Sequence, residues 1–513
     1  MSISRTRAAA VIGVEGFVVD VEAAVTAGVP GLHLYGLPET SFSEVRDRVR
    51  AAIHNSGLPW PNRHVTVGLH PVSLPKHGSG YDLVIAIAIL AANGTIPEAV
   101  GTGAVYLAEL GLDGTLRPIE AILPGALSAV AAGYSTIVVA GANAAEASAA
   151  PGTTVVAAET LTDIVRWLRG GRPPMTSHPQ TQSPRESQQQ TWPDLADLPD
   201  WPELRQALEA SAAGGHHLQL VGRHGVHQMG RALVPLLPDL SPDAAVQVTA
   251  IHSAAGLLDP QHPMITRPPY RCPSPSSSRT LLCGSHGRTT RPGEIALAHH
   301  GVLHLADAPE FTAGTLDALR GPLEDRYLTV ERADTHIHYP ARFLLLTTMA
   351  PCPCGGAHDT DCTCQPVTVH RYQGRLGGPI LDHIDIKVRL PDPQPSDILG
   401  PPEQAAASSV AAAERVTTAR GRAARRLAGT PWTTNAEIPT RELRRRFQPP
   451  YQAIAPLETA MRTGTLSARG ATRIIRLAWT LADLAGRDIP TTADVTTALD
   501  LYQPVHCSAR ITP

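Results

Sequence analysis

Residues 218–229 read LQLVGRHGVHQM, and this stretch decides the fold of the central part of the chain. The run LQLV predicts a short buried strand, the glycines Gly222 and Gly225 predict a tight turn, and the following residues predict a helix. This order is the setting in which backbone N–H groups cradle a phosphate. The full pattern G-x-x-x-x-G-K-[ST] is mostly missing, because His227, Gln228 and Met229 replace its second glycine, its lysine and its hydroxyl residue. The motif alone therefore favours a plain strand-to-helix connector.

The chain as a whole has 513 residues, which predicts about three domains. Alternating apolar runs and helical stretches predict an α+β domain over residues 1–168. Residues 169–191 are rich in Pro, Ser and Gln and predict a disordered linker. Strand and helix patterns alternate again over residues 192–392 and predict an α/β core. Residues 393–513 predict a helical domain, with one apolar face formed by Ile474, Ile475, Ala478, Ala482 and Ala485.

Composition predicts a cytoplasmic protein. The chain is 43% hydrophobic, but its longest apolar run, residues 83–92, is half of the roughly 20 residues that cross a bilayer. Glu15 and Asp20 interrupt the first apolar stretch before a signal peptide can form. We therefore expect no contact with a membrane.

The charge is unevenly distributed along the chain. The net charge is −3, yet residues 401–513 carry 15 Arg against 9 Asp and Glu. Any DNA contact is therefore expected in this region, and a solvated helix with internal ion pairs is the alternative. The candidate DNA contacts are Arg422, Arg425, Arg426, Arg444, Arg445 and Arg446.

Four of the seven cysteines lie within thirteen residues, in the pattern Cys352-Pro-Cys354 and Cys362-Thr-Cys364. Four thiolates on a short loop can converge on one zinc ion. The sequence therefore predicts a structural zinc site, with reduced free thiols or an iron–sulfur centre as alternatives.

Several long segments resemble one family. GVPGLHLYGLPET, EVRDRVRAAIHNSG and LPKHGSGYDLVIAIAIL resemble the N-terminal domain of magnesium-chelatase-like AAA+ proteins of ComM/YifB type. RPGEIALAHHGVLHL, YPARFLLLTTMAPCPCG and LGGPILDHIDI resemble its ATPase core, and LSARGATRIIRLAWTLADLAGRD resembles its C-terminal lid. The resemblance implies a Lon-protease-like (ribosomal S5 domain 2-like) N-terminal fold, a P-loop NTPase-like core and an α-helical lid. It also implies a ring-forming, ATP-driven motor on DNA, with relatives that promote branch migration during natural transformation.

The chain departs from the family pattern at the residues that handle nucleotide. The resemblance implies a lysine at Gln228, a hydroxyl at Met229, an aspartate at Ala306, a glutamate at Asp307, an asparagine at Ala350 and an arginine at His383. It implies that Arg469, which is kept, is the lid arginine. Each lost charge-assisted hydrogen bond costs about 1.5–3 kcal/mol. We therefore expect ATP and magnesium to bind poorly.

Two kinds of residue are candidates to compensate for the lost nucleotide-binding groups. Asp307 is a candidate shortened catalytic base or a plain surface aspartate, and Arg223 or Arg231 is a candidate replacement cation. Peptidase activity is rejected, because Gly80 stands at the nucleophile position and Lys76 is the single lysine of this domain.

Two functions follow from these observations. The first is a protein of structural or regulatory role in DNA processing or natural transformation, impaired as an ATPase and assembled in a ring, alone or with an intact paralogue. The alternative is an active, divergent ATP-driven DNA translocase or branch-migration helicase. The sequence leaves open whether the chain is an enzyme. The sequence does not distinguish the first function from that of a zinc-dependent scaffold that does not bind DNA.

Overall fold

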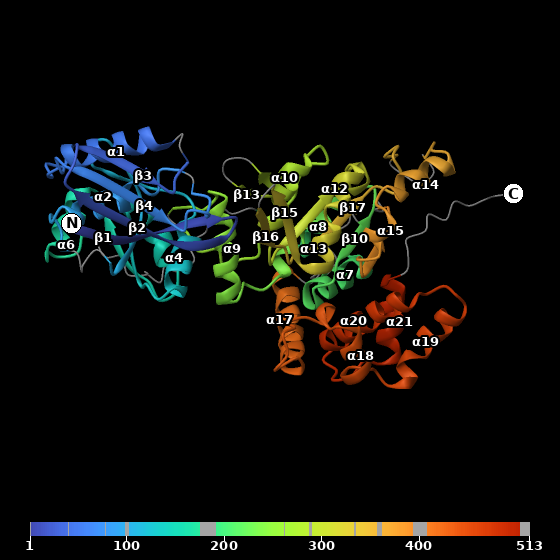
Figure 1. Cartoon of the computed structure of the whole chain (residues 1–513). Helices are drawn as coiled ribbons and strands as arrows, with labels where there is room; N and C mark the ends of the chain where they lie inside the picture. Colours follow the sequence, from blue (N-terminus) through green and yellow to red (C-terminus); the bar gives the residue numbers. More distant parts are fainter. Residues whose placement is uncertain are drawn as a thin grey trace.

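The computed structural model describes residues 2–38, 41–76, 78–97, 102–174, 191–260, 262–286, 290–332, 335–356, 362–392 and 408–502. Most of the expected linker, at 175–190, and the joint at 393–407 lie outside these residues. Figure 1 shows a sheet-containing N-terminal region, a central α/β region and a helical C-terminal region packed below the central one. Among the described residues, no helix combines the length and hydropathy that a membrane span requires.

A seven-stranded mixed sheet organises the N-terminal region. Strands β1 and β2 form a long hairpin, paired antiparallel from Ser2↔Val25 to Ile12↔Glu15. In sheet order the strands are β3 (Gly31–Tyr35), β4 (His64–His70), β2 (Glu15–Thr26), β1 (Ser2–Ile12), β5 (Ala104–Leu107), β8 (Thr136–Ala140) and β9 (Thr154–Ala158).

Helices cover both faces of this sheet because side chains alternate along a strand. Ala8 and Ala10 pack in the same cluster as α2 (Asp82–Ala92), while Ala9 packs with α4 (Ile122–Ala131). Every residue of α2 is buried, so the longest apolar run of the sequence is a core helix. The remaining elements are α1 (Phe42–Asn55), β6 (Glu109–Leu110), β7 (Leu116–Arg117), α5 (Ala144–Ser148) and α6 (Leu161–Leu168).

The central region contains a five-stranded sheet whose ladders are all parallel. The parallel arrangement confirms the α/β core expected from the alternating pattern. Its strands, in sheet order, are β11 (Tyr270–Arg271), β14 (Val302–Ala306), β17 (Leu344–Met349), β10 (Leu218–Val221) and β18 (Ile386–Arg389).

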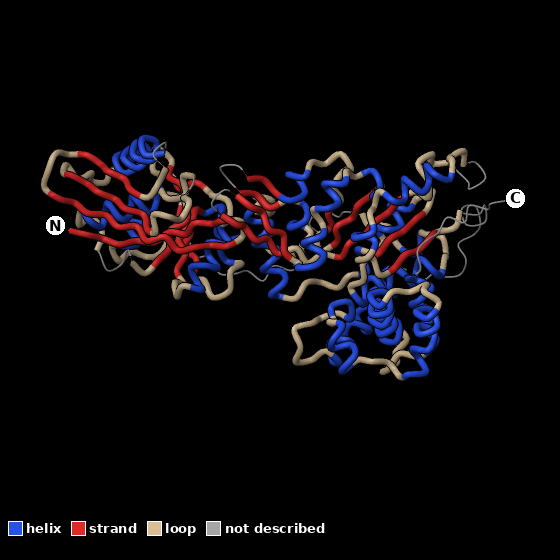
Figure 2. The backbone as a smooth tube through the Cα atoms, turned by 45° about the vertical axis from the view of Figure 1, so that its right-hand side comes forward, coloured by secondary structure: helices blue, strands red, loops and turns tan. Residues whose placement is uncertain are grey.

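Helices and two hairpins complete the central region (Figure 2). The helices are α7 (Pro202–Gly214), α8 (Val226–Arg231), α9 (Pro242–Ala254), α10 (Arg279–Cys283), α11 (Glu294–Leu297), α12 (Ala313–Asp317), α13 (Arg320–Asp325), α14 (Pro366–Gly374) and α15 (Gly378–Leu381). The hairpins are β12 (Gly284–His286) with β13 (Thr290–Pro292), and β15 (Tyr327–Arg332) with β16 (Thr335–Pro340).

The C-terminal region, called the lid below, is helical, as the sequence predicts. Its helix α20 packs Ile474 and Ala478 into one apolar cluster with Leu204 and Leu208 of α7. Burial of this shared apolar stripe attaches the lid to the core. The lid helices are α17 (Ser409–Arg426), α18 (Thr440–Arg446), α19 (Tyr451–Arg462), α20 (Ala468–Leu484) and α21 (Thr492–Tyr502).

A buried polar network also connects the lid to the core. His216 Nδ1 lies 3.1 Å from Asp385 Oδ2, and His216 Nε2 lies 2.8 Å from Thr480 Oγ1 of α20. Arg473 Nη1, also on α20, donates to Asp385 Oδ1 at 2.5 Å. Burial alone raises the pKa of Asp385, but Arg473 and His216 outweigh it and hold that pKa well below its usual range. The lid therefore docks through a charged and largely buried contact.

Candidate nucleotide site and metal centre

The parallel core sheet brings the sequence-predicted nucleotide residues to one edge. The carboxyl ends of parallel strands meet at the same edge, so Gly222, Ala306 and Ala350 lie at the ends of β10, β14 and β17. The Gly222 N–H donates to Met349 O at 3.0 Å across two of these strands. Gly225 adopts φ 63°, a left-handed conformation that suits glycine, and starts the short helix α8. The local strand, turn and helix are as the sequence predicts.

Two residues of α8 point in different directions. Gln228 is exposed, whereas Met229 is 5% exposed and belongs to the apolar core cluster. A thioether inside a core offers no oxygen to magnesium, which prefers oxygen ligands. Neither side chain therefore supplies the charge or the hydroxyl of a phosphate loop.

His227 fills the edge of the site through side-chain contacts. Its Nδ1 lies 2.7 Å from Thr348 Oγ1, and its Nε2 lies 3.4 Å from Asp307 Oδ2. Asp307 follows β14 directly and adopts a left-handed φ of 52°, so its carboxylate turns toward α8. The candidate catalytic carboxylate is thus engaged by the residue that replaces the loop glycine.

The network continues behind His227 into the sheet. Thr348 Oγ1 lies 2.8 Å from His304 Nε2, and His304 Nδ1 lies 2.6 Å from Tyr270 OH. Burial lowers the pKa of His304 to about 3, so its imidazole is neutral at pH 7. The sequence analysis missed this chain of contacts; its one signal was a polar His304 inside the apolar strand VLHLA.

The two arginines considered as replacement cations are occupied elsewhere. Arg223 has a 4% exposed side chain, and its Nη1 donates to Gly356 O at 2.7 Å and lies 3.7 Å from Cys352 Sγ. The Arg231 guanidinium stacks on Trp192, 5.4 Å from the ring centroid. Arg223 therefore joins the glycine turn to the cysteine loop.

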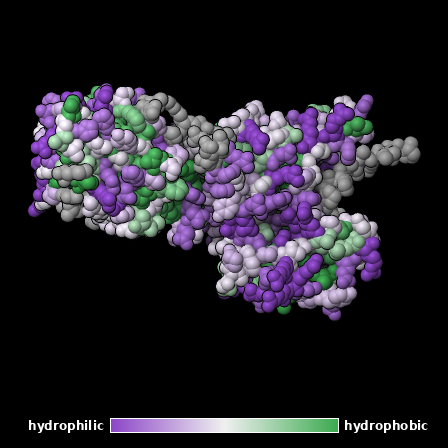
Figure 3. All heavy atoms as spheres, viewed as in Figure 1, coloured by the Kyte–Doolittle hydropathy of each residue, from purple (hydrophilic) through white to green (hydrophobic). Residues whose placement is uncertain are grey.

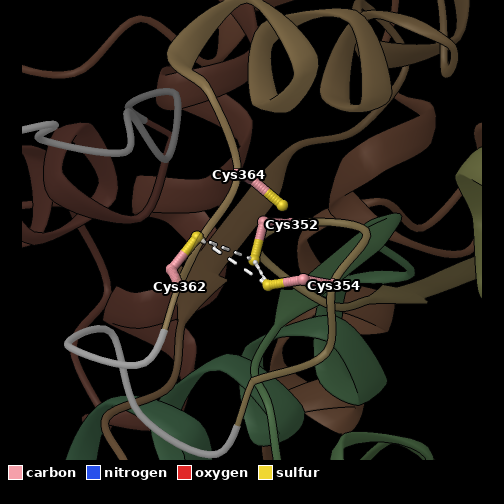
Figure 4. Close-up of side chains that lie close together, drawn as sticks. All are labelled: Cys352, Cys354, Cys362 and Cys364. Atoms are coloured by element: carbon pink, nitrogen blue, oxygen red, sulfur yellow. Dashed lines mark hydrogen bonds between the residues drawn. The ribbon is translucent and has the colours of Figure 1, made fainter.

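The four cysteines converge as the spacing predicts (Figure 4). The sulfur of Cys352 lies 3.3 Å from that of Cys354 and 3.5 Å from that of Cys362, and Cys354 and Cys362 are 3.8 Å apart. All four sulfurs, including that of Cys364, lie within 4.8 Å of one another. Zn–S bonds of about 2.3 Å in a tetrahedron place sulfurs roughly 3.8 Å apart. The four-cysteine cluster therefore fits a single metal ion such as zinc.

The cluster also favours a thiolate before any metal binds. The Gly356 backbone N–H, followed by Cys352, lowers the pKa of Cys354 to about 6. Burial raises the pKa of Cys352. Metal ligation requires thiolates, and Cys354 supplies the first at neutral pH.

Comparisons with known proteins cover all three regions. The profile described as "Magnesium chelatase, subunit ChlI" matches residues 194–398, "Subunit ChlI of Mg-chelatase" matches 21–143, and "Magnesium chelatase, subunit ChlI C-terminal" matches 406–502. Uncharacterized protein Rv2897c of Mycobacterium tuberculosis is 41% identical over 505 residues, 98% of this chain and 99% of that protein. YifB of Escherichia coli is 36% identical over 493 residues, 96% of this chain and 95% of YifB. Competence protein ComM of Haemophilus influenzae is 34% identical over 489 residues, 95% of this chain and 94% of ComM.

The chain belongs to the magnesium-chelatase-like AAA+ family of ComM/YifB type. This confirms the family that the sequence segments indicated.

Two further residues that the family pattern singles out lie where the core meets the lid. His383 Nε2 lies 3.7 Å from Glu324 Oε1, and burial lowers the pKa of His383. Arg469 is 69% exposed and its Nη1 lies 3.5 Å from Asp382 Oδ2. Arg469, on the lid helix α20, thus pairs at the surface with the core residue next to His383.

The candidate DNA arginines of this AAA+ chain do not form one surface. Arg426 lies inside the lid, where it pairs with Asp483 at 2.5 Å and stacks on Trp479, so its guanidinium is not free for a phosphate. Arg422 lies 3.7 Å from Asp488. The remaining four are exposed: Arg425, Arg444, Arg445 and Arg446.

The residues tested for peptidase chemistry have separate partners. Ser79 Oγ donates to a Glu109 carboxylate oxygen, while the buried Lys76 Nζ donates to Leu74 O at 3.1 Å. Burial lowers the pKa of Lys76, but its amine contacts backbone carbonyls rather than Ser79. Within the described residues, these contacts hold the loop before α2 and leave Ser79 without a lysine base.

Proposed function

We propose that this chain is a magnesium-chelatase-like AAA+ protein with a degenerate nucleotide site, impaired as an ATPase, that serves a structural or regulatory role in DNA processing or natural transformation. One observation carries the proposal. The side chains of the phosphate-loop edge have partners from other segments: Arg223 contacts the cysteine loop and His227 contacts Asp307. A triphosphate arriving at this edge meets no uncommitted cation from these two residues.

The energetic deficit supports the impaired site over the active motor. Gln228 and Met229 remove the phosphate-loop ammonium and the magnesium ligand, at about 1.5–3 kcal/mol for each charge-assisted contact. Two such losses weaken ATP binding by about a hundredfold to ten-thousandfold. Ala306 removes a second magnesium ligand, and Asp307 replaces the glutamate but is paired with His227. This balance favours an impaired site over an active, divergent motor.

Zinc is the metal we assign to the four-cysteine cluster. Cys352, Cys354, Cys362 and Cys364 would hold it, and zinc with four thiolates would cross-link a loop with little apolar content. The role is structural, because four protein ligands leave no open position for a substrate.

The link to DNA rests on the family and on charge. A relative is named competence protein ComM, and the exposed arginines Arg444, Arg445 and Arg446 form a basic stretch at the end of α18. Assembly in a ring, alone or with an intact paralogue, follows the family pattern and gives an impaired subunit a regulatory role.

An ATPase assay with and without DNA tests the main proposal. The purified full chain, with magnesium and labelled ATP, should turn over at background rate. Turnover that Asp307→Ala abolishes and Glu310→Ala preserves would establish the active motor instead. Glu310 is the matched control, because it is a half-exposed carboxylate in the same turn and pairs with Arg375.

Restoring the motif gives a gain-of-function test of the same reasoning. His227→Gly with Gln228→Lys returns the glycine and the ammonium, so affinity for a fluorescent ATP analogue should rise at least about tenfold. Gln228→Ala serves as the control that changes the same position without adding charge. Unchanged affinity in the restored variant would show that these replacements are not the cause of weak binding.

DNA binding is tested by the salt dependence of affinity. Replacement of Arg444, Arg445 and Arg446 by glutamine should weaken DNA binding and flatten the plot of log K against log salt by about 0.9 for each lost phosphate contact. Arg462→Gln, on the neighbouring helix α19, is the control. Equal slopes in the triple variant and the wild type would remove the lid from the DNA-binding surface.

A further inference from the structure

A cavity lies between the N-terminal sheet and the core, and its lining residues are separate from the nucleotide edge. Its volume is about 390 Å³, within the range of about 300–1,000 Å³ that ligand sites occupy. Figure 1 shows the β1–β2 hairpin reaching toward β13 and β16, and the cavity is lined from both sides of this junction. The core contributes Thr290, Arg291 and Ile337. An occupant therefore touches both regions.

The cavity sits where two neighbouring strands separate. β1 is paired with β2 along its whole length, but its parallel ladder with β5 is confined to Arg7↔Val105. Beyond that pair, Val11 and Ile12 line one side of the cavity, and Leu107 and Glu109 line the other. The cavity therefore lies beside β1 at the position where a further strand would pair with it. None of the described strands fills that position.

The open edge of β1 carries backbone groups that can pair with a peptide. N–H and C=O groups of successive residues point alternately to the two edges of a strand. Beyond Arg7↔Val105 the described residues give β1 no further register pair with β5, and the backbone hydrogen bonds outside the strand ladders include none from residues 9–12. At its end, the Gly13 N–H donates to Thr290 Oγ1 at 3.3 Å. Such an edge is a template for an added strand.

The charges around this edge favour a cation. Glu109 and Glu120 line the cavity, and Arg291 is the single cation among the described lining residues. Arg291 is already held by Glu120, with Nη2 at 2.9 and 3.1 Å from the two carboxylate oxygens. Glu109 accepts a hydrogen bond from Ser79 and contacts no cationic side chain among the described lining residues, while Arg48, outside the cavity, is bonded to Asp82. A basic side chain of a ligand would form an ion pair with the Glu109 carboxylate.

The remaining wall is apolar and partly strained. Aliphatic side chains such as Leu107, Ile119 and Ile337 form part of it, beside glycine and polar residues, and this part suits the aliphatic stem of a long basic residue. Ala121, also in the wall, adopts a left-handed φ of 61°. A non-glycine residue in this conformation stores strain, and such strain concentrates at binding sites.

We propose that this cavity binds an extended segment of a partner protein that carries a lysine or arginine. The segment adds a strand to the free edge of β1, and its basic side chain lies between the apolar wall and the Glu109 carboxylate. Because the walls come from both regions, the bound segment bridges the N-terminal sheet and the core.

Fluorescence anisotropy with a labelled peptide tests the proposal on the full chain. The probe is acetyl-Thr-Val-Lys-Val-Thr-amide carrying fluorescein, and the matched control peptide has glutamate in place of lysine. We expect saturable binding of the lysine peptide and at least tenfold weaker binding of the glutamate peptide. N-methylation of the two valine amides should abolish binding, because it removes strand pairing. Saturation by neither peptide up to about 1 mM, or equal affinity for both, would overturn the proposal.

Variants of the protein assign the binding to this cavity with effects of opposite sign. Glu109→Gln should weaken the lysine peptide at least about tenfold. Arg291→Gln should strengthen it, because Glu120 then becomes available to the ligand. Glu22→Gln, on the surface of the same sheet and paired with Arg5, is the matched control and should have no effect. Peptide affinity that is unchanged by both Glu109→Gln and Arg291→Gln would refute the site. If spermidine binds in a Glu109-dependent way and the peptide does not bind, the ligand is a small polyamine and the peptide proposal is wrong.

Discussion

Replacement of Arg223 by methionine tests how the glycine turn and the four-cysteine cluster depend on each other. The guanidinium lies 3.7 Å from Cys352 Sγ and donates to Gly356 O at 2.7 Å, with its side chain 4% exposed. Zinc with four thiolates carries a formal charge of −2, so this buried cation offsets part of the charge of the loaded cluster.

The magnitude follows from the distance. At an effective dielectric constant of about 20, unit charges 3.7 Å apart interact by about 4.5 kcal/mol, which is an upper limit. Loss of an outer-sphere partner typically weakens metal binding by about 10–100-fold, or about 1.4–2.7 kcal/mol. Arg223→Met should therefore bind zinc about 10–100-fold more weakly than the wild type.

Competition with a chromogenic chelator measures this affinity without reference to activity. Arg375→Met is the control, because Arg375 caps α14 in the same part of the core, is half exposed and pairs with Glu310 at 3.4 Å. Affinities within twofold of the wild type for Arg223→Met would refute the coupling. Less than about one zinc in the reduced wild-type protein would refute the metal site itself, which separates the two ideas.

Further predictions concern stability. Arg473→Met leaves the buried Asp385 without its guanidinium partner, with His216 as its remaining side-chain contact, and should cost about 3–5 kcal/mol. Arg469→Met on the same helix removes an exposed pair and should cost less than about 1 kcal/mol. Urea unfolding of both variants checks the difference, and equal losses would contradict the anchoring role. Burial lowers the pKa of His217 to about 4 and of His304 to about 3, so both are neutral in the fold, and their contribution to stability is complete above the unfolded pKa of about 6.5 and is lost as pH falls toward 4. His304→Gln should flatten the pH dependence of unfolding by up to about 1.4 kcal/mol per pH unit between pH 6 and 4, and an unchanged slope would show that His304 is not buried as a neutral imidazole.

Hydrophobic and hydrophilic residues are unevenly distributed on the face seen in Figure 3. Hydrophobic residues gather on the N-terminal region, interrupted by polar side chains, while the lid and core present many hydrophilic ones.

Local patterns were sufficient for much of the architecture. The strand LQLV, the turn at Gly225 and the helix after it formed as predicted, because each depends on neighbours within a few residues. The four cysteines lie within thirteen residues, which keeps their sulfurs close in space, so their convergence was also predictable. The face of α20 followed in large part from its 3.6-residue period: Ile474, Ala478 and Ala482 are fully buried, and Ile475 packs partly buried against the same cluster. The prediction was wrong for Ala485, which is exposed because the helix ends at Leu484.

Long-range contacts were beyond reach of these patterns. Arg426 and the exposed Arg425 are adjacent in sequence and equally basic, yet Asp483, 57 residues away, holds one of them inside the lid. The same holds for His227 of α8, whose partners Thr348 and Asp307 lie on β17 and directly after β14.

The sequence by itself indicated the family through the resemblance of whole segments. It also predicted the α/β core, the helical lid and the absence of the phosphate-loop lysine, because periodicity and motif spacing are local properties. Only the tertiary structure decided that Arg223 serves the cysteine loop, that Arg473 anchors the lid and that β1 keeps a free edge beside two carboxylates. Those outcomes depend on which strands and helices meet, since the worth of a charge is set by the burial and the partners that folding brings to it.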